Sequence, residues 1–151
     1  MANDLNAKVE AFLKEVTGAL GLSLEVSVEE HEDHTRMDLT GAGGEVLLRR
    51  KGEALDALQH IVNTAFRRGP NADQHFVVDC LGFRKAREAE LRQMTQFLIE
   101  KAKTTREPQE IGPLNPFHRR LVHLQVADDP LVSSESVGDA FMKTVIISAK
   151  K

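Results

Sequence analysis

The sequence predicts a mixed α+β fold built as two small units in series. Segments with helical apolar spacing alternate with segments of strand-like alternation along the whole chain. The length of 151 residues suits one ordinary domain or two very small ones. Apolar residues make up 41% and charged residues 28% of the chain, a balance typical of a packed fold rather than a disordered one.

The first 80 residues predict the order helix, strand, strand, short helix, helix, strand. Apolar residues at helical spacing end at Gly21, and two alternating stretches then flank a turn near residues 30–33. The glycines of residues 41–44 break the chain before one helical turn and a long amphipathic helix. The expected elements cover, in order, residues 5–20, 22–28, 36–39, 45–48, 53–66 and 75–81.

A second set of elements follows a natural seam at residues 82–84. Asn115 is placed to cap a helix that has Pro116 in its first position, and residues 128–130 end that helix. The expected elements are a helix over 85–103, a strand over 107–111, a helix over 116–127, and strands over 131–137 and 144–149. We therefore expect two domains, residues 1–82 and 83–151.

Charge is distributed unevenly along the chain, whose net charge is −3. Residues 1–46 hold ten acidic and three basic side chains, whereas residues 47–151 hold thirteen acidic and seventeen basic ones. A basic portion behind an acidic front favours a polyanion-binding surface, but the acidic total disfavours one. The charge distribution alone therefore does not distinguish a polyanion-binding surface from an ordinary solvated face.

The cysteine content and the apolar runs indicate the compartment. Cys80 is the single cysteine and lies in the apolar stretch 75–81, so we expect a buried small side chain and no internal disulfide. No apolar run approaches the ~20 residues that span a bilayer. The first residues also lack the features of a signal peptide, so we expect a cytoplasmic protein without a membrane segment.

The first candidate site is the basic stretch Arg49-Arg50-Lys51-Gly52. It separates the short helical turn from the helix over 53–66, where backbone N–H groups at a helix start are unpaired. Those groups and three cationic side chains favour a phosphate. An exposed basic turn without a ligand is an equally good interpretation of these residues.

The second candidate site is the helix that begins at Asn115. Arg119 and His123 are four residues apart and therefore share a helix face, with Arg120 beside them. A guanidinium can bind phosphate in two-pronged fashion, and an imidazole can hydrogen-bond or stack on a base. We expect Phe117, Leu121 and Leu124 to anchor the opposite side in the core. An ordinary amphipathic helix is the alternative.

Both stretches resemble the bacterial Jag family, also called SpoIIIJ-associated, KhpB or EloR proteins. Residues 49–63 are similar to its type II KH segment, and residues 115–123 to its R-x-x-x-H domain, also written R-three-H. The resemblance covers nearly the whole chain in the same order. It implies a type II KH domain of order αββααβ and a small domain with a three-stranded sheet packed on helices.

The resemblance also implies a function. Jag proteins bind RNA, are linked to cell elongation and division in some bacteria, and often pair with a small KH-only protein. By position, Arg49, Arg50, Lys51 and Gly52 would form the GxxG loop, and Arg119 and His123 the R-x-x-x-H pair. Arg49 replaces the first glycine of that loop, which would weaken the clamp or exchange close backbone contact for side-chain charge.

We therefore expect a non-enzymatic protein that binds single-stranded RNA, or single-stranded DNA, and acts post-transcriptionally. The alternative is an interaction scaffold whose KH domain pairs with itself or with a KH-only partner instead of binding RNA. The His31–His34 stretch lacks the spacing of a zinc motif and is expected to be a solvated turn. Ser133, Ser134 and Ser136 are expected to lie far from a convincing base–acid arrangement, and we expect no metal and no cofactor.

Overall fold

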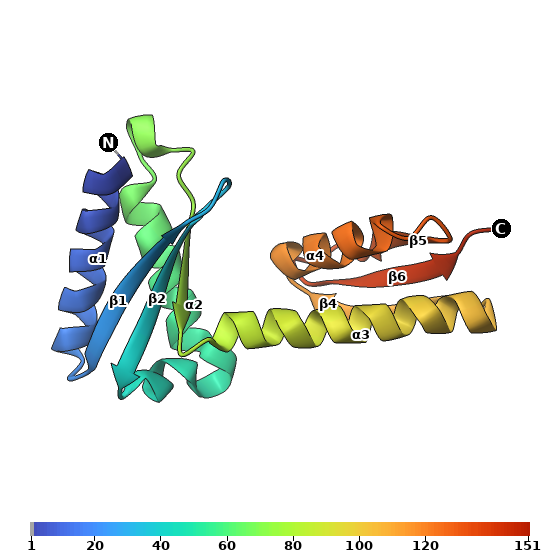
Figure 1. The fold of residues 1–151 in the computed structure, drawn as a ribbon, viewed down its shortest axis with the longest axis horizontal. Coiled ribbons are helices and arrows are strands. Elements are labelled where there is room, and N and C mark those ends of the chain that lie inside the picture. The colour runs from blue at the N-terminus through green and yellow to red at the C-terminus, as the bar shows by residue number, and fades with distance from the viewer. Residues whose placement is uncertain (1) are drawn as a thin grey trace. The chain divides into compact units, whose positions relative to one another are not determined.

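The computed structural model describes residues 2–151, and side chains from Asp4 onward, and it is divided into two compact units (Figure 1). The first unit ends at Lys85, and the second is Ala86–Lys151. Each has its own apolar core, and the α+β class that the sequence predicts is confirmed.

The first unit contains the predicted order of elements and packs its helices on a three-stranded sheet. Its elements are α1 (Ala2–Ala19), β1 (Ser23–Glu30), β2 (Thr35–Ala42), the 3-10 helix η1 (Gly44–Leu48), α2 (Arg49–Phe66), the 3-10 turn η2 (Gly69–Asn71) and β3 (Phe76–Cys80). The strand order is β1-β2-β3, with β1 and β2 antiparallel and β2 and β3 parallel. α1 packs on β1 and α2 packs on β3.

The core of this unit is built from the apolar faces that the sequence predicts. Leu13, Met37, Leu55 and Phe76, one each from α1, β2, α2 and β3, are completely buried. The rings of Phe12 and Phe66 meet edge to face at 5.6 Å, which joins α1 to the end of α2.

A buried carboxylate organises the end of the first unit. Asp79 on β3 is completely buried, and its Oδ2 lies 2.7 Å from Nη2 of the buried Arg36 on β2. Its Oδ1 accepts hydrogen bonds from the backbone N–H groups of Cys80 and Arg84, each at 2.8 Å. Asp79 thus neutralises a buried guanidinium and caps the first turn of α3 (Phe83–Thr105), whose N–H groups have no partner within the helix.

The second unit holds most of α3, followed by β4 (Gln109–Leu114), α4 (Pro116–Ala127), β5 (Val132–Val137) and β6 (Lys143–Ala149). Its sheet is antiparallel, in the order β4-β6-β5. Ile99 of α3, Val122 of α4 and Ile147 of β6 belong to the same buried cluster. The predicted cap is confirmed, because the Asn115 side chain accepts a hydrogen bond from the His118 N–H at 2.8 Å.

One expectation about α4 is wrong. Phe117 and Leu124 are 49% and 55% exposed, whereas Val122 and Val126 are buried and anchor the helix. The helix carries two apolar stripes, and the core takes the one with the smaller, β-branched side chains.

Replacing Asp79 by Asn should destabilise the first unit by about 3–5 kcal/mol, because a buried guanidinium loses its counter-charge. Asparagine keeps an acceptor for the helix cap, so the loss reports mainly on the ion pair. Asp38→Asn is the matched control, since Asp38 lies 3.3 Å from the Arg36 Nε but is partly exposed. Urea unfolding of both variants gives the comparison, and equal losses would contradict this role for Asp79.

Candidate functional site

The basic loop between η1 and α2 is exposed and has an unusual backbone. Arg50, Lys51 and Gly52 have φ values of 54°, 59° and 79°, so three successive residues are left-handed. Regular helix therefore starts at Glu53, as the sequence predicts. A left-handed conformation costs a non-glycine residue roughly 1–2 kcal/mol, so this loop is held by its surroundings.

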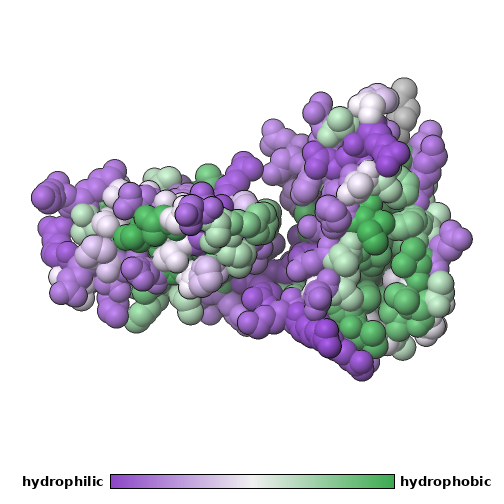
Figure 2. Space-filling model, turned by 180° about the vertical axis from the view of Figure 1, so that it is seen from behind, coloured by the Kyte–Doolittle hydropathy of each residue, from purple (hydrophilic) through white to green (hydrophobic). Residues whose placement is uncertain are grey.

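Gly52 seats the loop on the start of α3. A Cβ atom at Gly52 would lie 2.7 Å from Cε1 of Phe83, closer than side chains approach one another. Gly52 is buried, whereas Arg49, Arg50 and Lys51 are exposed. Hydrophilic residues protrude at the end of the unit where η1 leads into α2 (Figures 1 and 2). The loop therefore presents three cations to solvent on a fixed backbone.

The backbone of Arg49, the first residue of this loop, is not strained. Arg49 has φ −61° and ψ 150°, an extended conformation open to any residue. An arginine therefore fits this position without conformational strain. Its side chain is exposed and adds a cation to those of Arg50 and Lys51.

Arg119 is the more constrained of the two predicted cations on α4. Its Nη1 donates hydrogen bonds to the carbonyl oxygens of Leu114, at 2.7 Å, and Phe141, at 2.8 Å. These carbonyls belong to the end of β4 and to the turn between β5 and β6. One guanidinium nitrogen therefore ties two backbone segments together, while Nε and Nη2 have no hydrogen bond to the described residues. Arg120 is exposed.

His123 is held by two serines of β5. Its Nδ1 lies 2.7 Å from Oγ of Ser134, and its Nε2 lies 2.8 Å from Oγ of Ser136. Ser134 and Ser136 therefore do lie beside a histidine, although not beside a base that is paired with an acid. Since each ring nitrogen meets a hydroxyl, no carboxylate of the described residues orients this imidazole as in a serine-hydrolase triad.

The structure thus brings Arg119, His123, Ser134 and Ser136 to one surface made by α4 and β5. Arg119 and His123 are one turn apart on α4, and both are partly exposed. Lys143, at the start of β6, pairs with Leu114 across the sheet, which places a further cation beside this surface. Sequence patterns do not reveal Ser134, Ser136 or Lys143, because strand register brings them there.

The His31–His34 stretch, whose two histidines invite comparison with a metal site, is a turn between two strands. The His31 and His34 rings stack at 4.6 Å in the β1–β2 turn, where their ring nitrogens lie near Glu29 and Asp33. Within residues 2–151 no group of three or more His, Cys, Asp or Glu side chains is arranged to hold a metal.

Cys80 is 1% exposed, as expected. Burial, together with the nearby Asp79 and Glu45, raises the pKa of its thiol to about 11, so it stays protonated at neutral pH. A reactive thiolate is therefore not a feature of this part of the chain.

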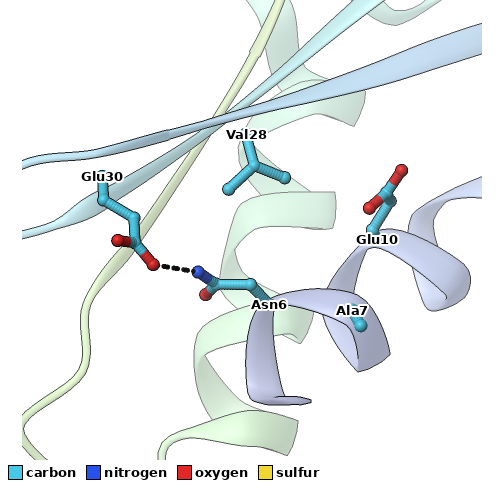
Figure 3. Close-up of a pocket in the computed structure, with 5 residues that line it drawn as sticks. All are labelled: Asn6, Ala7, Glu10, Val28 and Glu30. Carbon is cyan, nitrogen blue, oxygen red and sulfur yellow. Dashed lines mark hydrogen bonds between the residues drawn. The ribbon is translucent and has the colours of Figure 1, made fainter. Parts of the chain in front are cut away.

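A depression of about 430 Å³ between α1 and β1 has the wrong charge for a polyanion (Figure 3). Its lining includes Glu10 and Glu30, and Asn6 donates a hydrogen bond to the Glu30 Oε1 at 2.7 Å.

None of the helices in residues 2–151 is long and apolar enough to cross a bilayer.

Comparison with known proteins gives two kinds of match. Residues 89–149 match the model of the R-three-H domain. Over 97% of its length the chain is 28% identical to a protein of Clostridium symbiosum named RNA-binding protein KhpB, and it covers 67% of that protein. It is 23% identical to the RNA-binding protein KhpB of Bacillus subtilis strain 168, over 95% of the chain and 70% of the relative. A Lactiplantibacillus plantarum protein of the same name is 20% identical over 93% of the chain, which covers 44% of that relative.

Replacing Gly52 by Ala should destabilise the chain by about 1–3 kcal/mol, because the new methyl group meets Phe83 and the residue is left-handed. Gly69→Ala is the control, since Gly69 also has a positive φ, of 57°, but nothing lies within 4 Å of its added Cβ. Thermal unfolding measures both. If Gly52→Ala costs no more than Gly69→Ala, Phe83 does not hold the loop.

Proposed function

We propose that this chain is a non-enzymatic protein that binds single-stranded RNA on two cationic surfaces. The observation that carries the proposal is the fixed Arg119 guanidinium beside the His123–serine cluster, inside the stretch that matches the R-three-H domain. The names of the relatives support RNA as the ligand.

The two surfaces are the loop at residues 49–52, called the first surface, and the face of α4 and β5 with Arg119 and His123, called the second surface. On the second surface, Arg119 binds a phosphate. Its Nη1 is used by two carbonyls, so Nε and Nη2 remain to face the oxygen atoms of a phosphate. His123 offers its ring face to a base, because both of its nitrogens already meet hydroxyls. The Ser134 and Ser136 hydroxyls can hydrogen-bond a ribose 2′-OH, and Arg120 adds charge at the edge of the surface.

On the first surface, the loop Arg49-Arg50-Lys51-Gly52 follows the backbone of neighbouring nucleotides. We assign the first unit to the type II KH class, which its element order αββααβ and the parallel β2–β3 pair support. In this role the arginine at position 49 supplies charge where a KH loop usually supplies a bare glycine backbone.

The resemblance to Jag proteins extends the proposal to the cell. The protein would act in the cytoplasm as a post-transcriptional regulator connected with cell elongation or division. It would work alone or with a second KH-domain protein.

The second candidate function is an interaction scaffold whose KH-like unit pairs with itself or with such a partner. One face of the first unit carries a continuous apolar area (Figure 2). Leu20 and Ile61 of this unit are 61% and 49% exposed. Light scattering with and without RNA separates the two functions, because a scaffold would form dimers whether or not RNA is present.

Removing the second surface should weaken RNA binding strongly. Arg119→Ala with His123→Ala should lower the affinity for a short single-stranded RNA by about 10- to 100-fold, since a hydrogen bond to a charged group contributes about 1.5–3 kcal/mol. The loss of one phosphate contact should also reduce the slope of log K against log salt by about 0.7. Fluorescence anisotropy measures both, with the matched DNA strand compared in parallel.

Arg92→Ala is the control, because it removes an equal charge from an exposed position on α3 in the same unit. It should change the affinity by less than about threefold at moderate salt. Equal effects of the control and the double variant, with both folded, would show that binding depends on overall charge and not on this surface.

A further inference from the structure

A phenylalanine in the β5–β6 turn is exposed to solvent, and its backbone carbonyl is hydrogen-bonded to Arg119. Phe141 is 72% exposed, more than the other exposed large apolar residues of the described chain, and the neighbouring Met142 is 45% exposed. A Phe side chain gains about 1.5–3 kcal/mol when it is buried, so the free chain forgoes this gain at Phe141. Single exposed apolar residues are common, and position and chemistry must decide whether this one has a role.

The position of Phe141 is defined by its own backbone. Its carbonyl oxygen accepts a hydrogen bond from the Arg119 Nη1 at 2.8 Å, and the same nitrogen binds the Leu114 carbonyl at 2.7 Å. Arg119 therefore tethers the turn to α4 and to the end of β4. The side chain of Phe141 leaves the backbone one atom from that carbonyl group, so Arg119 fixes the backbone that carries the exposed ring.

The charges on the elements next to the turn favour a polyanion over an apolar protein or a lipid tail. Arg119, Arg120 and Lys143 lie on the helix and the strand next to the turn, and Asp139 is the acidic residue of the turn itself. A flat apolar ring among cations is the combination that single-stranded nucleic acid requires, because phosphates need charge and bases need a stacking face.

We propose that Phe141 is a stacking platform for one nucleobase of the strand whose phosphate is bound by Arg119. This inference rests on the proposed function and adds a base-contacting residue to it. Stacking on an aromatic side chain contributes about 1–3 kcal/mol per base and tolerates any base, so it supplies affinity with little sequence preference. Arg119 then has two roles, since it holds the phosphate and fixes the turn that carries the ring.

The chain contains no Trp and no Tyr, which makes a direct optical test possible. Phe141→Trp would create a single tryptophan at the proposed platform. Phe97→Trp is the matched control, because Phe97 is also an exposed phenylalanine, 65% exposed, but lies on α3. A ten-nucleotide RNA should quench the fluorescence of Phe141→Trp and leave that of Phe97→Trp unchanged.

Affinity provides the second readout. Phe141→Ala should lower the affinity for the RNA by about 5- to 100-fold, whereas Phe97→Ala should leave it unchanged. The salt slope should stay that of the unsubstituted chain, because no phosphate contact is lost. An abasic strand with the same sugar-phosphate backbone should bind Phe141→Ala and the unsubstituted chain equally well.

The outcomes separate this inference from the function on which it rests. If the unsubstituted chain binds RNA and Arg119→Ala weakens binding, but Phe141→Ala changes nothing and Phe141→Trp is not quenched, the platform is wrong and the proposed function stands. If the unsubstituted chain binds neither the RNA nor the abasic strand, both are wrong. If Phe141→Ala lowers the affinity for the abasic strand as much as for the RNA, the ring supports the turn and does not stack on a base.

Discussion

The buried carboxylate of Asp79 is the constraint on which the first unit and its basic loop depend. It pairs with Arg36 on the neighbouring strand and accepts the Arg84 N–H in the first turn of α3. That turn begins with Phe83, whose ring lies where a side chain at Gly52 would need to be. The buried Asp79 carboxylate thereby helps to determine the position of the exposed, strained loop at residues 49–52.

The second unit also fixes the position of a candidate binding group, but it does so with backbone carbonyls instead of a buried carboxylate. Arg119 has no ion pair within the described residues, and its contacts are two backbone carbonyls from separate segments. Carbonyls position a guanidinium without cancelling its charge, whereas a carboxylate would do both. A cation that is fixed but not neutralised is well suited to bind a phosphate, because the cost of ordering the side chain has already been met by the fold.

Substitutions at the Asp79–Arg36 pair and at the Arg119 contacts should have different effects. The Asp79–Arg36 pair is buried, so its loss should appear as loss of stability. The contacts of the second surface are partly exposed, and a loss there should appear mainly in binding. This difference explains why functional variants should concentrate on α4, β5 and the turn before β6, while the junction at Asp79 should accept few substitutions.

Much of this fold could be predicted because each element shows its buried face in its own spacing. The helix over 53–66 and the Asn115 cap are examples, since the residues that decide them lie within a few positions of one another. On α4 the same rule failed, because local spacing offers two apolar stripes and only the rest of the core selects the one with Val122 and Val126. Tertiary packing decides such cases.

The candidate site was predictable only in part for the same reason. Arg119 and His123 are neighbours on one helix, so their spacing reveals them. Ser134 and Ser136 are eleven and thirteen residues from His123 and reach it through the register of β5. Phe141 reaches Arg119 across 22 residues through its backbone carbonyl, a contact to which its side chain contributes nothing.

The central claim is that a strand of RNA lies on the fixed cation of α4, and amide NMR tests it most directly. Titration of the ¹⁵N-labelled chain with a short single-stranded RNA should move the signals of α4, of β5 and of the turn at residues 138–142, and those of the loop at 49–52. The account would be contradicted if the RNA binds and those signals stay in place while signals elsewhere, such as the acidic depression of α1 and β1, move instead.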